Sequence, residues 1–226
     1  MATKKTKEAE KKPVQELLRM LHDTFEEMLG ECTGDDGVIR AKVDNIGVLG
    51  AQVIVEVMLE GGLQETAPRG VLRFHTILVE NVPEESVADL LIALNALNHA
   101  MCAGACQGFG VFCYYEHLNQ VYLGYRMPVN LTQIEANYDN IRYYLTVLYE
   151  QLDVFIDFIM FTLTSPGSMD ISEYMSYLNE VADIDDLEER FKVFEEQFAE
   201  MAKRLGYDSD EIEAVKLSDG EPEGEV

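Results

Sequence analysis

The sequence predicts an α+β domain in which helices pack an antiparallel sheet, followed by a helical extension. Two blocks of residues, 38–80 and 109–127, contain apolar residues that alternate with polar ones, as along β-strands. Segments before, between and after these blocks instead repeat apolar residues every three or four positions, as on amphipathic helices. Glycine, proline and polar turn residues separate the segments. The expected element order within residues 13–163 is therefore α–βββ–α–ββ–α.

The first helix and three strands account for the first half of this domain. Pro13 suits the first turn of a helix, which is expected to end near Gly30. Three strand-like runs follow, at 38–46, 48–60 and 71–80. Their alternation is typical of an antiparallel meander with one face toward the core and the other toward solvent.

The second half contains two further helices and a hairpin. A helix is expected to begin at Pro83, with acidic residues at its positive end, and to stop by Gly108. Strands at 109–115 and 121–127 come next, and Pro128 is expected to end the second of them.

A long third helix is predicted from Asn130, which suits a helix cap, to about residue 163. Its apolar residues step alternately by four and three, which makes a heptad seam: Ile134, Tyr138, Ile141, Leu145, Leu148, Leu152, Phe155 and Ile159. Such a seam packs either within one chain or between two chains, and the period alone does not decide between them.

Three further regions flank the domain. Residues 1–12 have mixed charge and are expected to form a disordered tail. Residues 164–206 are expected to form an extension of two capped amphipathic helices. Residues 207–226 are acidic, contain few apolar residues, and are expected to be disordered.

The charge of the chain restricts the partners that we expect. The 226 residues carry a formal net charge of −25, and the pI is about 4.3. This charge disfavours binding to nucleic acid or to an anionic membrane surface. No apolar run reaches the roughly 18 residues of a membrane span, and no secretory apolar region follows the charged start. We therefore expect a cytoplasmic protein whose four cysteines are reduced thiols.

Residues 71–163 resemble a known pattern. The stretch VLRFHTILVENVPEESVADLLIALNALNHAM combines a strand, an apolar-Pro step and a helix with the pattern Leu-x-x-Leu-Asn-x-x-Asn, here Leu91, Leu94, Asn95 and Asn98. The hairpin GFGVFCYYEHLNQVYLGYRMPV then ends in a second such step, Met127-Pro128. In these features the chain resembles the YbjN-like and type III secretion chaperone-like families. The resemblance implies an α+β fold, usually dimeric, that binds other proteins, and it implies no catalytic residues or cofactor.

The expected function is therefore that of a non-enzymatic, chaperone- or adaptor-like bacterial module. We expect it to be a homodimer that holds a protein or peptide segment on an apolar surface of its sheet and helices. Apolar residues of the strands and of the heptad-like helices are the candidate contacts with that partner: Val53, Val55, Val57, Phe74, Leu145, Leu152, Phe191 and Phe198.

Two alternative functions remain open. His99, Cys102, Cys106 and Cys113, with His117 beyond them, could serve a metal-dependent sensor or enzyme. However, they lack paired CxxC motifs, and small buried side chains explain the cysteines as well, so no metal or cofactor is expected. Alternatively, the C-terminal helices could fold back and occlude the binding face of a regulatory subunit.

Several polar residues also have more than one interpretation. Asp153 and Asp157 could perform acid–base chemistry, mark the wet stripe of their helix, or face a cationic partner. Asn95 and Asn98 are interpreted as amides that bond a neighbouring strand or loop end rather than a ligand. Four basic residues fall in the first strand block: Arg40, Lys42, Arg69 and Arg73. A basic spot of this kind either seats an acidic partner or reflects cross-strand pairing with Glu56 or Glu60.

Overall fold

The fold is α+β, as predicted. The computed structural model describes residues 2–35, 37–60, 69–103, 108–164 and 171–181, with residues 189, 192, 193 and 196. Six strands form one antiparallel sheet in the order β1-β2-β3-β4-β6-β5. The elements are α1 (Ala2–Leu29), β1 (Cys32–Asp35), β2 (Val38–Ile46), β3 (Ala51–Glu60), β4 (Arg69–Glu80), the 3₁₀ turn η1 (Glu84–Ser86), α2 (Val87–Cys102), β5 (Val111–Tyr115), β6 (Gln120–Asn130), α3 (Ile134–Thr164) and α4 (Ile171–Val181).

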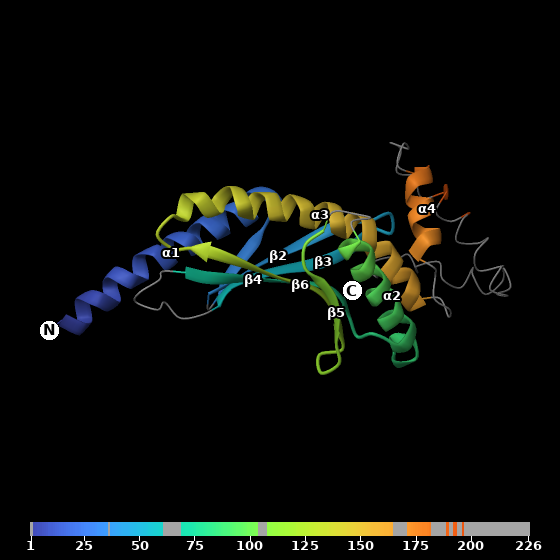
Figure 1. Cartoon of the computed structure of the whole chain (residues 1–226), viewed down its shortest axis with the longest axis horizontal. Helices are drawn as coiled ribbons and strands as arrows, with labels where there is room; N and C mark the ends of the chain where they lie inside the picture. Colours follow the sequence, from blue (N-terminus) through green and yellow to red (C-terminus); the bar gives the residue numbers. More distant parts are fainter. Residues whose placement is uncertain are drawn as a thin grey trace, which may run out of the picture.

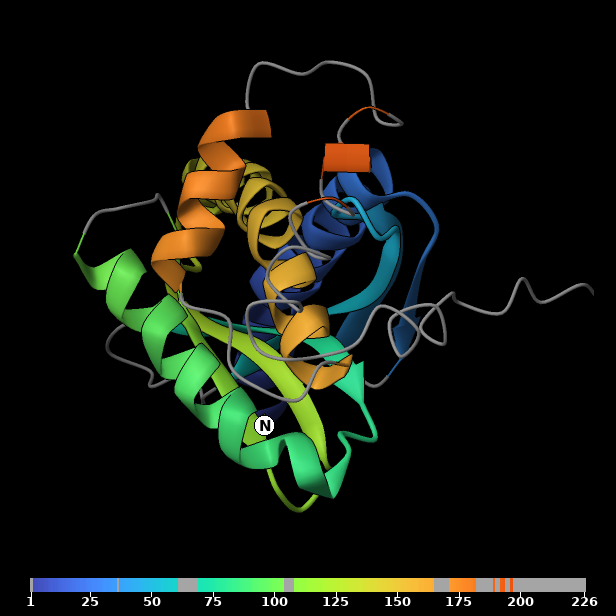
Figure 2. The same ribbon diagram turned by 90° about the vertical axis from the view of Figure 1, so that its right-hand side faces the viewer.

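Two layers make up the domain. Helices α1 and α3 lie together over one face of the sheet, and they contact each other and strand β2 (Figure 1). Helix α2 packs beside β5 and against α3 (Figure 2), and α4 lies near α2 at the opposite end of the molecule from the start of α1 (Figure 1). Within the described ranges, the helices therefore leave the second face of the sheet uncovered.

The core lies between the sheet and helices α1 and α3, and Phe74 on β4 is at its centre. The Phe74 side chain is fully buried, and its ring centroid lies 4.3 Å from that of Tyr144 on α3. The ring of Phe25 on α1 is 6.5 Å from Phe74, and that of Tyr125 on β6 is 6.4 Å away. One aromatic cluster thus joins both covering helices to strands β4 and β6.

The heptad seam of α3 packs within the chain. Six of its eight residues are buried under the sheet and α1, with at most 2% exposure: Ile141, Leu145, Leu148, Leu152, Phe155 and Ile159. The long helix therefore has no free seam for a coiled-coil partner. No helix in the described ranges has both the length and the hydropathy that crossing a membrane requires.

The N-terminal region differs from the prediction. Helix α1 begins at Ala2, so residues 2–12 are helical where a disordered tail was expected, and Pro13 lies inside the helix. Lysine, glutamate and alanine dominate this stretch and have high helix propensities, which favours extension of the helix upstream of Pro13. Strand β1 is also additional, because its residues 33–35 belong to a polar and glycine-rich stretch, 33–37, that is typical of a turn.

Strand boundaries differ from the prediction at two points. Strand β3 starts at Ala51 rather than residue 48, since residues 47–50 turn between β2 and β3. Strand β6 continues through Pro128 to Asn130, although proline was expected to end it. Because β5 pairs only with residues 120–124, no paired strand flanks the far side of β6 at Pro128. The missing N–H of that proline is therefore tolerated.

The helical extension is described in part. Helix α4 is anchored by Tyr174, which is buried, donates a hydrogen bond to the Val154 carbonyl (2.6 Å) and packs on Phe158 with ring centroids 5.1 Å apart. The second predicted helix of residues 164–206 falls largely outside the described residues, and the acidic segment 207–226 does so entirely.

Candidate partner-binding surface

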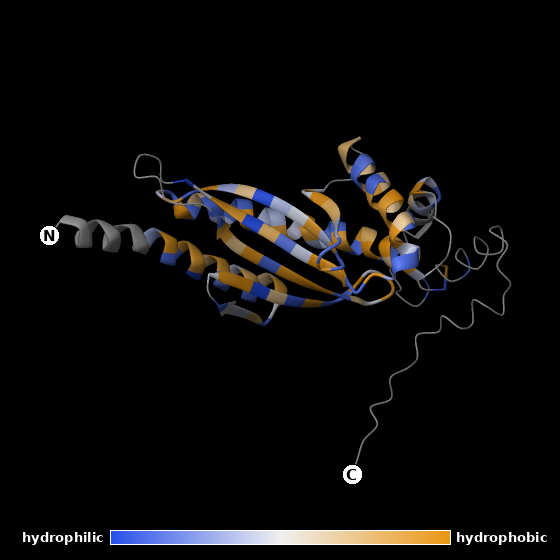
Figure 3. Cartoon of the chain, turned by 90° about the horizontal axis from the view of Figure 1, so that it is seen from below, coloured by the Kyte–Doolittle hydropathy of each residue, from blue (hydrophilic) through white to orange (hydrophobic). Residues whose placement is uncertain are grey.

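The candidate site is the sheet face turned away from α1 and α3, which we call the open face. Figure 3 shows it from below: the strands present alternating hydrophilic and hydrophobic residues, and none of the described helices lies across them. An antiparallel sheet commonly has one solvated face, so exposure alone is ordinary. The composition of this face is what distinguishes it.

Strand pairing arranges the open face in rows that run across the sheet. One row is mainly apolar and contains Lys42, Ile54, Ile77, Tyr122 and Cys113. The next contains Thr33, Arg40, Glu56, His75, Gly124 and Val111, and the third contains Asp35, Val38, Met58, Arg73 and Arg126. The open face therefore combines a partly buried apolar strip with an adjacent strip of charged side chains.

Glu56 is at the centre of the charged strip. Its carboxylate accepts a hydrogen bond from Nε of Arg40 (2.7 Å), and its other oxygen is 3.5 Å from Nδ1 of His75. Only 11% of the Glu56 side chain is exposed, against 57% for Arg40. The carboxylate thus lies deep in the face and the guanidinium lies above it.

Glu60 has two arginine neighbours. Its Oε1 is 3.1 Å from Nη1 of Arg73, and its Oε2 is 3.1 Å from Nη2 of Arg126. Together with the Arg40–Glu56 pair, these contacts confirm cross-strand pairing for Arg40 and Arg73, two of the four basic residues singled out in the sequence. A single carboxylate cannot neutralise two guanidinium groups, so this trio retains one positive charge.

His75 connects the charged and apolar strips. Its ring meets Tyr122 edge to face, with centroids 4.5 Å apart. Burial lowers the pKa of His75 below its ordinary value, and the nearby Arg73 lowers it further, while Glu56 opposes the shift. The imidazole is therefore neutral near pH 7.

This arrangement predicts the titration of His75. An NMR titration is expected to place its pKa below the ordinary 6.5. The variant Glu56→Gln should lower the pKa of His75 further, because it removes the carboxylate that favours the imidazolium. Since the pKa of His75 is lower in the folded state, its contribution to the free energy of unfolding is fully present above pH 6.5. That contribution is lost as the pH falls through the folded pKa. A pKa of His75 that rose in Glu56→Gln would contradict the account.

The predicted contact residues lie elsewhere. Six of the eight are buried with at most 2% exposure: Val53, Val55, Val57, Phe74, Leu145 and Leu152. They fill the core between sheet and helices, so their assignment to a binding surface is corrected. Phe191 and Phe198 lie outside the described residues. The outward residues of the same strands, such as Ile54, Met58 and Ile77, were missed as candidates, although their alternation with the buried set was visible in the sequence.

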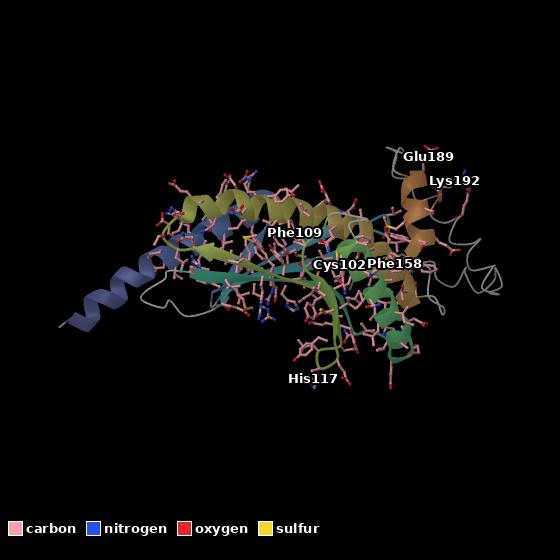
Figure 4. The ribbon with its side chains drawn as sticks, viewed as in Figure 1. Cys102, Phe109, His117, Phe158, Glu189 and Lys192 are labelled. Atoms are coloured by element: carbon pink, nitrogen blue, oxygen red, sulfur yellow. The ribbon has the colours of Figure 1, made fainter. Side chains whose placement is uncertain are left out.

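The cysteine and histidine residues do not converge in the described part of the chain. Cys102 is at the exposed end of α2, and His117 is at the tip of the β5–β6 hairpin, well separated from it (Figure 4). Cys113 is on the open face of β5, and Cys106 lies outside the described residues. Across the described ranges, no three His, Cys, Asp or Glu side chains are grouped so as to hold a metal ion.

The two singled-out carboxylates of α3 hold a turn. Asp153 accepts a hydrogen bond from the Gly47 N–H (2.9 Å), and Asp157 accepts two, from Val48 (2.8 Å) and Leu49 (3.1 Å). A side chain at Gly47 would collide with Asp157, its Cβ lying 2.6 Å from the carboxylate oxygen. The pair therefore fastens the β2–β3 turn to α3, a role that was not among the interpretations of the sequence.

Asn98 fulfils its predicted role. Its Nδ2 donates to the Phe112 carbonyl and its Oδ1 accepts from the Phe112 N–H, both at 2.9 Å. The amide thus occupies backbone groups on the outer edge of β5, where another strand would otherwise pair. Asn95 is exposed. Edge pairing at Phe112 is therefore blocked by α2, which leaves the open face, rather than this edge, for a partner.

The C-terminal extension does not occlude the open face as far as the structure describes it. Helix α4 packs near α2 and on α3 through Tyr174, on the helical side of the domain (Figure 1). Occlusion by α4 is therefore not observed, and the remainder of the extension lies outside the described residues.

Comparison with known proteins gives no relative. No protein-family model, curated protein or solved structure matches the chain. The resemblance to the YbjN-like and secretion chaperone-like families therefore stays a prediction, and function is inferred from the surface itself.

Proposed function

We propose that the chain is a non-enzymatic protein-binding module, chaperone- or adaptor-like, that holds a polypeptide segment on its open face. The observation that carries this proposal is the apolar strip on that face. Ile54, Ile77 and Tyr122 occupy one row across three adjacent strands, and Met58 lies on the same face of β3, on the other side of Glu56. An apolar row beside arginines offers both burial and directed hydrogen bonds to a bound chain.

We also propose that the protein is cytoplasmic and homodimeric. Among the described residues, seven large apolar side chains are at least 44% exposed, and three of them are on α2 or the tip of the β5–β6 hairpin: Leu91, Ile92 and Leu118. A second copy would therefore dock at this end of the domain rather than on α3, whose seam is already buried. The open face would stay free for the partner.

A variant-dependent capture experiment tests the proposal. The variant Ile54→Glu introduces a charge into the apolar strip and is expected to abolish co-purification of the polypeptides that the wild-type chain retains from its native cells. Tyr143→Glu is the matched control, because Tyr143 on α3 is 57% exposed on the helical side. It should retain the same polypeptides as the wild type.

The fold of both variants is checked by thermal unfolding, and the capture is compared at a temperature where both are folded. Loss of the same polypeptides in Tyr143→Glu, or their retention in Ile54→Glu, would contradict binding at the open face.

A further inference from the structure

The open face concentrates the cations of an acidic chain. The sequence has seventeen lysine and arginine residues, five of them within residues 1–12, which leaves twelve for the rest. By strand register, five of those twelve project from the open face: Arg40, Lys42, Arg69, Arg73 and Arg126. More than a third of the remaining cations thus gathers on one face of one sheet.

Four of these cations are more exposed than the carboxylates that pair with the arginines. The side chains of Arg40, Lys42, Arg73 and Arg126 are between 40% and 70% exposed, whereas those of Glu56 and Glu60 are 11% and 28% exposed. Three further carboxylates lie on the edge strand or near strand ends: Asp35, Asp44 and Glu80. The five cations and five carboxylates of the face sum to zero, in a chain whose net charge is −25.

The arginines also have unused donors. A guanidinium carries five N–H groups in a planar fork, and Arg73 and Arg126 each direct one nitrogen to their shared Glu60. Within the described residues neither arginine has a second carboxylate partner. A carboxylate of a bound chain can accept two such donors at once. The acidity of the distant surface matters little, because charges beyond about 8 Å are largely screened at physiological salt.

The spacing of the cations suits an extended chain. Arg40 on β2 and Arg126 on β6 are separated by three inter-strand steps, which corresponds to roughly 14 Å at about 4.8 Å per step. An extended chain advances roughly 3.3 Å per residue, so acidic residues about four positions apart would reach both arginines. Residues at that separation point to the same side of an extended chain.

We propose that the open face binds an acidic, extended polypeptide segment of another protein, with carboxylates over Arg40, Arg73 and Arg126 and apolar side chains over Ile54, Ile77 and Tyr122. This inference rests on the proposed function and adds the chemistry of the partner.

Fluorescence anisotropy with synthetic peptides tests it on the full-length chain. The probe is a labelled peptide with glutamates about four residues apart and leucines between them, and the comparison peptide has glutamine in place of glutamate. The glutamate peptide is expected to bind at least about tenfold more tightly, and its affinity should fall as salt rises. The variant Arg126→Gln should weaken it by about three- to tenfold, a loss in the range of one ordinary hydrogen bond.

Arg142→Gln is the control, because Arg142 pairs with Glu27 on the helical side (2.6 Å). It should leave the affinity unchanged. Equal binding of the two peptides, or no effect of Arg126→Gln, would overturn the inference while leaving polypeptide binding by the apolar strip intact. A particle mass in light scattering that falls to the monomer in Arg126→Gln without peptide would assign the face to a second copy and would also overturn it.

Discussion

Replacing Phe74 with alanine is expected to lower the free energy of unfolding by about 3–5 kcal/mol. The ring is fully buried and lies against Tyr144 at 4.3 Å, with Phe25 and Tyr125 farther out. Its removal leaves a cavity at the point where α1, α3, β4 and β6 meet, and the surrounding rings cannot all collapse into it. Denaturant unfolding followed by circular dichroism measures the effect.

Tyr115→Ala is the matched control for this prediction. Tyr115 is an aromatic residue of the same sheet, but it is 44% exposed, so its loss should change the free energy of unfolding by less than about 1 kcal/mol. If Phe74→Ala left the stability unchanged but abolished partner binding, Phe74 would be a contact residue and its placement in the core would be wrong.

Replacing Asp157 with asparagine is expected to lower the free energy of unfolding by about 1–3 kcal/mol. Both carboxylate oxygens accept backbone N–H groups of the β2–β3 turn, from Val48 and Leu49. An asparagine retains one acceptor oxygen and turns an NH₂ group toward the other N–H, so one donor of the turn loses its partner. Asp153→Asn is the control: Asp153 is exposed and holds one amide, that of Gly47, so its loss should be smaller.

The pH dependence of the Asp157 effect follows from its burial. Burial raises the pKa of Asp157 above the ordinary 3.8, with a contribution from Asp153, although the two backbone N–H groups oppose the shift. Because the pKa of Asp157 is raised in the folded state, its contribution to the free energy of unfolding is fully present below pH 3.8. That contribution is lost as the pH rises through the folded pKa. The deficit of Asp157→Asn should therefore be largest in acid and narrow toward neutral pH. A deficit that grew with pH would show that the carboxylate is stabilised, not penalised, in its charged form.

The order of elements was predictable because the spacing of apolar residues and the turn residues between segments are local features of the sequence. Alternation of apolar and polar residues indicated strands β2, β3 and β4 and the β5–β6 hairpin, and the heptad spacing indicated α3. Strand β1 was missed because Thr33, Gly34 and Asp35 have turn propensity, and their pairing with residues 38–40 of β2 is not visible in a local pattern. Residues 2–12 were misassigned because charge was weighed above helix propensity.

The orientation of the sheet was not predictable in the same way. On β3, both alternating sets contain apolar residues: Val53, Val55 and Val57 on one side, Ile54 and Met58 on the other. The alternation of side chains along a strand indicates that the sheet has two faces. Only the packing of α1 and α3 determines which of them is buried. The candidate contacts were therefore taken from the more uniformly apolar set, which forms the core.

Some polar contacts could be predicted from the local sequence and others could not. Asn98 was predicted to bond a strand because an amide on an apolar helix face needs a partner, and Phe112 provides it. The partners of Asp153 and Asp157 are more than a hundred residues away in the sequence, so no local pattern could indicate them. The charged strip was anticipated in part, since Arg40, Arg73 and their glutamates lie in neighbouring strands, whereas Arg126 joins it through the β4–β6 pairing.

Site-specific photo-cross-linking in native cells tests the central claim, that polypeptide partners bind the open face, most directly. A benzophenone side chain is placed at Met58 or Tyr122 on the open face, and at Tyr143 or Tyr149 on the exposed side of α3. The account predicts cross-links to other polypeptides from Met58 and Tyr122 and none from the two α3 positions. Cross-links from α3 alone, or equal cross-linking from both sides, would contradict it.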